Sequence, residues 1–82
     1  MRYVLITFES THEAIKTEKA LRDLDVEMIP TPRQLSASCG LSLKTYIEDL
    51  ENIQVILGES YNKNNQVYLV EFEDKVLTFK KV

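Results

Sequence analysis

The sequence predicts an α+β domain of the ferredoxin-like βαββαβ kind, an antiparallel sheet with two helices on one face, followed by an extra C-terminal strand. Short runs of β-branched and aromatic residues alternate with two segments whose apolar residues recur at helical spacing. A capping signal precedes each helical segment, and turn residues separate the strands. Because 82 residues suffice for one core, we expect a single domain over residues 1–82.

The first part of the chain predicts a strand, a helix and a second strand. Residues 3–8 are almost continuously apolar, as in a central strand. Ser10 and Glu13 form a capping box, so a helix begins there and fades near residues 23–25. Residues 26–29 form a short strand. The apolar face of the helix is expected to hold Ala14, Thr17, Ala20, Leu21 and Leu24.

The second part predicts a strand, a helix and two further strands. Residues 40–44 alternate in polarity, and Thr45 with Glu48 offers a second capping box. Gly58 is placed to cap the end of this helix. The apolar face of the helix is expected to hold Tyr46, Ile47, Leu50, Ile53 and Leu57. The last two strands are expected over residues 67–72 and 76–79, joined by a tight turn at 73–75.

The sheet face without helices must be solvated, covered by the C-terminal hairpin or paired with another subunit. Tyr3, Leu5, Tyr68 and Phe79 fall on this face and are too apolar to be left exposed together. We therefore expect a homo-oligomer, most simply a dimer.

Composition excludes several classes of function. The net charge is −3 and the basic residues are scattered, which argues against nucleic acid as a partner. The single cysteine cannot form an internal disulfide or a multi-cysteine zinc site, so we expect neither a metal nor another cofactor. No apolar run is long enough for a membrane helix, and the N-terminus leads directly into a strand without a signal peptide. These features predict a soluble protein of the reducing cytoplasm.

The segment from Pro30 to Leu43 carries the chemistry of the chain. It contains both prolines, the only cysteine, Cys39, and one of the two glycines, Gly40. The prolines end the preceding strand and stiffen the loop. Gly40 either takes a positive φ or lets another group approach Cys39. Cys39 therefore lies where a loop joins a strand, a place where a rigid neighbour can hold a reactive group.

The predicted topology brings this loop to the start of the first helix. The first two strands are parallel and end at the same edge of the sheet, where the helix begins. Helix N-termini carry partial positive charge and free N–H groups, which favour a thiolate and suit a small anion. The residues expected around Cys39 are Ser10, Thr11, His12, Arg33, Ser38 and Gly40.

Plainer interpretations of the same residues stay open. A free cysteine is most often a packed core residue. His12 fits an exposed residue at a helix start, and Arg33 fits a solvated loop charge or a salt bridge. Ser36 and Ser38 fit turn formers, because no base accompanies them in the sequence.

Three segments resemble the DUF3343 family, also described as selenium/sulfur carrier-like domains. They are residues 8–14, 18–21 and 32–43, and the Pro-Arg…Ser-x-x-Cys-Gly pattern in the last is the most specific. The resemblance covers the first half of the chain closely and the second helix more loosely. It implies a compact α/β domain with one functional cysteine, Cys39. Residues 74–82 extend beyond the usual end of such domains.

The leading hypothesis is a sulfur or selenium carrier in which Cys39 accepts the atom as a persulfide or selenosulfide. Donor and acceptor proteins would be its partners, and it need not be a free-standing enzyme. The alternative is a non-catalytic module that binds a small molecule or a protein, with Cys39 only packing. Three other functions lack their sequence signatures. A metal carrier would need Cys-x-x-Cys in the first loop, and an acyl-phosphate hydrolase would need a basic phosphate cradle there, whereas this loop reads Ser-Thr-His. A sheet-type RNA binder would need positive charge, which this chain lacks. A cysteine hydrolase would have only His12 as a base.

Overall fold

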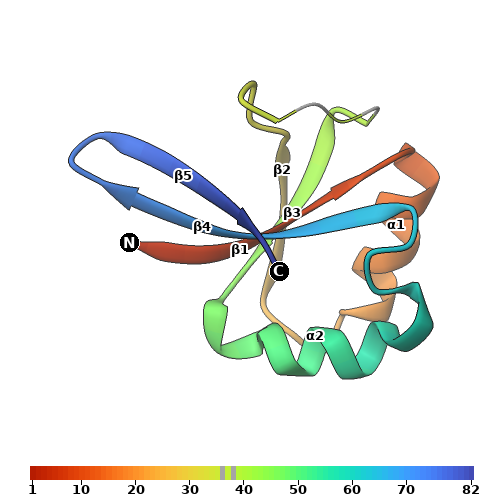
Figure 1. Cartoon of the computed structure of the whole chain (residues 1–82). Coiled ribbons are helices and arrows are strands. Elements are labelled where there is room, and N and C mark those ends of the chain that lie inside the picture. Colours follow the sequence, from red (N-terminus) through yellow and green to blue (C-terminus); the bar gives the residue numbers. More distant parts are fainter. Residues whose placement is uncertain (36, 38) are drawn as a thin grey trace.

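The computed structural model describes residues 1–35, 37 and 39–82. Strands and helices alternate along the chain as β-α-β-β-α-β-β, with short 3₁₀ helices before and after α2 (Figure 1). The elements are β1 (Arg2–Phe8), α1 (Thr11–Ala20), β2 (Val26–Pro30), β3 (Leu41–Thr45), η1 (Ile47–Asp49), α2 (Leu50–Leu57), η2 (Gly58–Ser60), β4 (Asn65–Glu73) and β5 (Val76–Lys81).

The strands form one five-stranded sheet in the order β2-β3-β1-β4-β5. Every neighbouring pair is antiparallel, and β1 lies in the middle between β3 and β4. The predicted α+β class, the antiparallel sheet and the extra C-terminal strand are thus confirmed. The additional strand β5 pairs with β4 and forms one edge of the sheet, while β2 forms the other.

Both helices pack against the same face of the sheet. Alternate residues of a strand point to one face, and in β1 these are Val4, Ile6 and Phe8. Their cross-strand partners Leu43 and Val67 point to the same face. The helices complete this core with Ala14, Leu21, Ile53 and Leu57. Burial of this apolar surface is the main force that holds the helices on the sheet.

Helix α1 begins where its capping signal predicts. The Ser10 side chain accepts a hydrogen bond from the Glu13 N–H at 3.2 Å, which satisfies one of the free donors of the first turn. Ala14, Thr17 and Leu21 are buried as expected. Ala20 is exposed, contrary to the prediction, and the helix ends there rather than near residues 23–25.

The start of α2 differs from the prediction. Thr45 does not cap a helix, because it is the last residue of β3 and its hydroxyl donates to the Asp25 carbonyl at 3.1 Å. The chain then forms η1 before α2 begins at Leu50. Tyr46, predicted on the apolar face, is consequently exposed. Gly58 does follow the last turn of α2, with a φ of 51° that favours glycine.

The β4–β5 hairpin is longer than the sequence predicts. Glu73 pairs with Val76, so only Asp74 and Lys75 form the turn. Their φ angles are 52° and 67°, as in the type I′ turns that match the twist of a hairpin. The hairpin therefore continues the sheet well beyond the layer of helices (Figure 1).

The sequence left open whether the face opposite the helices is solvated, covered by the C-terminal hairpin or paired with another subunit, and in the structure its middle is covered within the chain. Leu5 is completely buried, although it points to this face. Its cross-strand partners are Tyr68 and Lys44, and Tyr68 packs edge-to-face on Phe79 with ring centroids 6.3 Å apart. Tyr3, Tyr68 and Phe79 are each half-buried. The middle of this face is thus covered by its own large side chains, which the sequence pattern alone did not reveal.

Candidate functional site

The loop between β2 and β3 is attached to the end of β1 by main-chain hydrogen bonds. The Cys39 N–H donates to the carbonyl of Phe8, the last residue of β1, at 3.2 Å. The Thr31 N–H donates to the Gly40 carbonyl at 2.9 Å, which extends the pairing of β2 with β3 by one residue. The loop and the first turn of α1 therefore meet at one edge of the sheet (Figure 1).

The Cys39 sulfur lies against the first turn of α1. Its Sγ atom is 3.7 Å from Thr11 Oγ1, within hydrogen-bond reach for sulfur. The Leu41 N–H points at the same sulfur, with the nitrogen 3.4 Å away. The residue is only 4% exposed and belongs to the core beneath the helices. The sulfur thus lies between an apolar interior and two groups that can donate hydrogen bonds to it.

Thr31 holds the main chain at Cys39 in place. Its hydroxyl donates to the Cys39 carbonyl at 3.1 Å and lies 2.6 Å from the hydroxyl of Ser42, which is fully buried. Sequence reasoning missed this residue, since its role depends on the register in which Pro30 pairs with Leu41. The only signal was its position between two prolines at the end of a strand.

The other predicted site residues lie near this edge without a polar contact to the sulfur among the described residues. Ser10 is used as the cap of α1. His12 and Arg33 are exposed, on the first turn of α1 and in the loop. Ser38, with Ser36, lies outside the described residues. The structure therefore brings Thr11 to Cys39 and leaves His12 and Arg33 facing solvent.

Gly40 needs no glycine-specific conformation, which excludes the first of the two interpretations of this residue, a positive φ. Its φ is not positive, and a Cβ atom built on it would meet no atom of the described residues within 4 Å. Nothing within the described chain approaches Cys39 through this position. The open space in front of Gly40 faces outward, because the residue is exposed.

A polar hollow of about 430 Å³ lies beside the same edge. Phe8 and Glu9, at the end of β1, and Ala37, in the loop, form one side of it. The other side holds the amide groups of the loop before β4, with Tyr68 and Lys81. Cys39 does not line this hollow: Thr7, Gln66 and Tyr68 place the hollow on the sheet face opposite the core that holds Cys39.

The described part of the chain shows neither a metal cluster nor a membrane span. No three His, Cys, Asp or Glu side chains among residues 1–35, 37 and 39–82 gather as metal ligands would. Within the same residues, neither helix is long and apolar enough to cross a membrane.

A protein-family model described as "Putative Se/S carrier protein-like" matches residues 3–69. The match begins in β1 and ends within β4, so it includes the Cys39 loop and both helices but not β5. No curated protein and no solved structure matches the chain significantly.

Proposed function

Because the chain belongs to the Se/S carrier-like family, we propose that it carries sulfur or selenium on Cys39. Cys39 accepts the atom from a donor protein and passes it to an acceptor protein. The observation that carries this proposal is the position of the sulfur, 3.7 Å from Thr11 Oγ1 at the start of α1 and 3.4 Å from the Leu41 nitrogen. Both groups can donate to a sulfur that bears negative charge.

Loading is an exchange that needs no added oxidant or reductant. The Cys39 thiol first gives its proton to solvent. The thiolate then attacks the outer sulfur of a persulfide on the donor, so a bond forms between Cys39 Sγ and that sulfur. The donor's own sulfur–sulfur bond breaks, and its electron pair leaves with the donor thiolate. With selenium the donor carries a selenosulfide, and the same bonds form and break; delivery to the acceptor is the reverse exchange.

The surroundings of Cys39 suit a carrier that must hold a reactive atom. It is the only cysteine of the chain, so no second thiol can discharge a persulfide by forming an internal disulfide. Its burial keeps water and small thiols away from the loaded atom. The same burial requires that Cys39 become exposed when the donor binds. His12 and Arg33 are exposed near this edge, and we assign them to contact with the donor or with the incoming anion.

The remaining features of this proposal follow from the same residues. Gly40 leaves open space through which a donor group approaches, and Ser10 fixes the turn of α1 that presents Thr11. We further propose that β1 to β4 with the two helices form the ferredoxin-like arrangement, with β5 added at its edge. A free cysteine that exchanges sulfur fits the reducing cytoplasm, where thiols persist.

The test is to load the reduced protein with a sulfane-sulfur donor and to follow its intact mass. Wild-type protein is expected to gain the mass of one sulfur atom, and Cys39→Ala none. Thr11→Val should slow loading by about tenfold, since it removes a hydrogen bond to a charged sulfur. Thr17→Val is the matched control, because Thr17 is buried on the same helix and has no described polar contact to Cys39. A wild-type protein that gains no sulfur, or equal rates for the two threonine variants, would contradict the proposal.

A second candidate rests on the burial of Cys39. At 4% exposure, within the core, the residue has the surroundings of a cysteine that only packs. The chain would then be a binding or interaction module whose activity does not depend on sulfur. Under this reading, Cys39→Ala keeps partner binding and changes only the stability of the fold. Under the carrier proposal, the same variant keeps the fold but ends sulfur transfer.

A further inference from the structure

Strand β5 forms an edge of the sheet, and its outer main-chain groups have no partner within the described chain. The pairing with β4 shows which groups these are. The N–H of Val82, the residue after β5, donates to the Val67 carbonyl at 3.0 Å. Successive residues of an antiparallel pair bond alternately inward and outward. The even-numbered residues of β5 therefore bond to β4, and the N–H and C=O groups of Leu77, Phe79 and Lys81 point outward.

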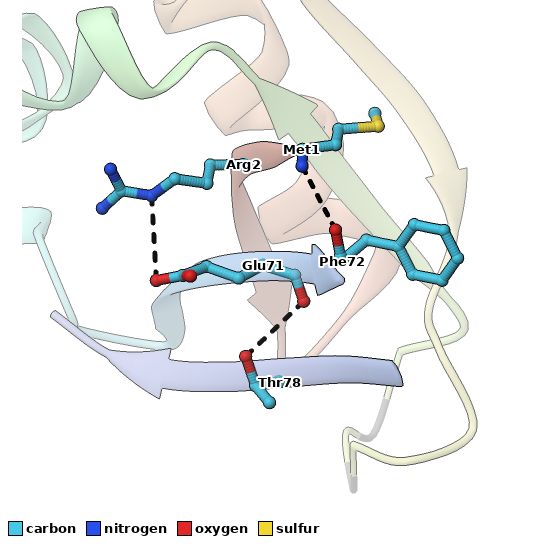
Figure 2. A network of polar contacts seen from close by, with 5 residues as sticks. All are labelled: Met1, Arg2, Glu71, Phe72 and Thr78. Carbon is cyan, nitrogen blue, oxygen red and sulfur yellow. Dashed lines mark hydrogen bonds and ion pairs between the residues drawn. The ribbon is translucent and has the colours of Figure 1, made fainter. Parts of the chain in front are cut away.

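The carbonyls of β4 show the same alternation. The Phe72 carbonyl accepts from the Met1 amino group at 3.1 Å, so it faces β1 (Figure 2). The carbonyl of the preceding residue, Glu71, faces β5, where the Thr78 hydroxyl donates to it at 3.5 Å (Figure 2). Glu71 and Thr78 are direct cross-strand partners. The main chain of Thr78 is thus turned inward, and that of its two neighbours in β5 lies on the outer side.

The opposite edge of the sheet, β2, is less open to pairing. The Thr31 N–H donates to the Gly40 carbonyl just beyond the end of β2. By the same alternation, Met28 and Pro30 carry the outward groups of that strand. Proline has no N–H, and natural sheets use it to close an edge. β5 contains no proline, and its register with β4 has no bulge, so a further strand can be added at β5.

The side chains along this edge determine what can pair with it. Leu77 and Phe79 are half-buried, and Phe79 lies against Tyr68 on the face opposite the helices. Lys80 and Lys81 are exposed and make no ion pair with a described residue. β5 itself has no acidic side chain. The edge thus offers apolar contacts followed by two positive charges that the described chain leaves unpaired.

We propose that β5 binds an extended segment of a partner protein that carries acidic residues. The segment adds a sixth strand to the sheet, and its main chain bonds to the outward groups of Leu77, Phe79 and Lys81. Its acidic side chains lie beside Lys80 and Lys81. Its apolar side chains lie beside Leu77 and Phe79. Main-chain bonds supply the affinity, and the two lysines select the sign of the partner's charge.

A second copy of β5 is a poorer occupant of this edge. It would bring two further lysines and no carboxylate into the added strand. Like charges close together across a strand pair are destabilising, so the lysines that attract an acidic segment also oppose pairing with another copy. The proposal is independent of the sulfur chemistry, because it uses no residue of the Cys39 loop.

Amide hydrogen exchange of the full chain, followed by NMR, tests the proposal residue by residue. The probe is a synthetic peptide of alternating glutamate and valine, and a peptide of alternating lysine and valine is its control. The acidic peptide is expected to slow exchange at Leu77, Phe79 and Lys81 by about tenfold or more. Thr78 and Lys80 already bond to β4 and should change less. The basic peptide should leave the exchange rates along β5 unchanged.

Two pairs of variants separate the main-chain contribution from the charge. Leu77→Pro removes one outward N–H without breaking a bond to β4, and Leu77→Ala, which keeps that N–H, is its control. Lys80→Glu reverses one charge of the edge, and Lys16→Glu, at an exposed position of α1, is its control. Leu77→Pro and Lys80→Glu should each weaken binding of the acidic peptide by about tenfold. Their controls should weaken it by less than about threefold.

Each outcome decides the question, with circular dichroism to show that the variants are folded. Alternate protection that appears with the acidic peptide and is lost in Leu77→Pro supports the proposal. A wild-type chain that shows no protection at millimolar peptide overturns it. Equal protection by the acidic and the basic peptide also overturns it, because charge would then not select the partner. Protection that grows with protein concentration in the absence of peptide assigns the edge to a second copy and overturns the proposed partner.

Discussion

Cys39 and its two hydrogen-bonding neighbours form the smallest unit of the proposed mechanism. The sulfur meets Thr11 from α1 and the main chain of Leu41 from β3, so two separate elements fix its surroundings. Thr31 fixes the Cys39 carbonyl from a third element, the end of β2. A substitution at Thr31 should therefore change how accessible the Cys39 sulfur is, while both hydrogen-bonding groups at the sulfur remain in place.

Thr31→Val tests this effect. Valine keeps the branched shape but leaves the Cys39 carbonyl and the buried Ser42 hydroxyl without their partner. We expect the free energy of unfolding to fall by about 1–3 kcal/mol and alkylation of Cys39 in the folded protein to become faster. Urea unfolding and the rate of reaction with iodoacetamide measure the two effects.

Thr78→Val is the control for this change. The Thr78 hydroxyl also bonds a carbonyl, that of Glu71 at 3.5 Å, but on an exposed strand. The free energy of unfolding of Thr78→Val should stay within about 0.5 kcal/mol of the wild-type value. The rate at which Cys39 is alkylated in this variant should be unchanged. Equal effects of the two variants would show that Thr31 does not hold the loop.

The burial of Tyr3 predicts that the stability of the fold depends on pH in the alkaline range. Burial raises the pKa of Tyr3 above its ordinary value of 10.0, because the phenolate loses solvation. Below that value both the folded and the unfolded chain hold the proton, so Tyr3 adds no pH dependence. Above it the unfolded chain releases the proton first, and stability falls as the pH rises.

Tyr3→Phe removes this contribution. The measurement is the free energy of unfolding in urea at about pH 8 and about pH 10.5, below and above the ordinary tyrosine range. The wild type should lose more stability between these two values than the variant does. Identical losses would show that Tyr3 does not contribute to the alkaline sensitivity.

At this scale the sequence predicted some contacts and missed others. It placed Cys39 beside the first turn of α1, because the order of elements alone determines which ends share an edge. It did not predict Thr31, because that contact depends on the register of two strands. For Gly40 it left open a positive φ or a close approach to Cys39, and the backbone excludes the first, since a glycine beside a cysteine carries no information about φ.

The ends of the helices show how local signals succeed or fail. Ser10 caps α1 as its capping box predicts, because the strand ends before it and leaves the residue free to turn. Thr45 has the same signal but is held in β3, where pairing with Val4 and Val26 outweighs a cap. A capping signal is thus overridden where a strand competes for the same residue.

The two glycines predict opposite effects of one substitution. Gly58 ends α2 with φ 51°, a conformation that costs a residue with a Cβ atom about 1–2 kcal/mol. Gly58→Ala should therefore lower the unfolding temperature. Gly40→Ala should leave the unfolding temperature unchanged or raise the free energy of unfolding by about 0.4–1 kcal/mol. The reason is that the φ of Gly40 is not positive and the space around it is open.

Thermal unfolding of the two variants measures this difference. Gly40→Ala also separates stability from function, since a methyl group there narrows the approach to Cys39 from outside. We expect it to slow sulfur loading while the fold is kept. If Gly40→Ala destabilises the protein as much as Gly58→Ala does, the assigned backbone conformation is wrong.

Two features of the molecule lie at opposite ends of the sheet. Cys39 lies at the edge where β1 ends, and a groove lined by Tyr3 and Tyr46 lies where β1 begins. The family match ends at residue 69 within β4, so most of the β4–β5 hairpin lies outside the matched residues.

The sequence predicted the fold class and the sheet, because the alternation of strand and helix patterns fixes both. It could not predict how far the open face is covered. Leu5 is sealed by Tyr68, Lys44 and the other large side chains on its own face, and this depends on packing between strands far apart in the sequence. The exposed apolar residues of that face, Met1 and Phe72, lie at its end rather than at its middle.

The most direct test of the carrier function compares the folded chain with the same chain unfolded in urea. Both receive the same sulfane-sulfur donor, and intact mass follows the uptake of sulfur and its loss to a small thiol. If the fold builds a carrier site, the folded chain takes up one sulfur on Cys39 and retains it about tenfold longer than the unfolded chain, because Cys39 is buried in the fold. If the folded chain takes up none while the unfolded chain loads fully, the fold only buries Cys39, and the carrier function is contradicted.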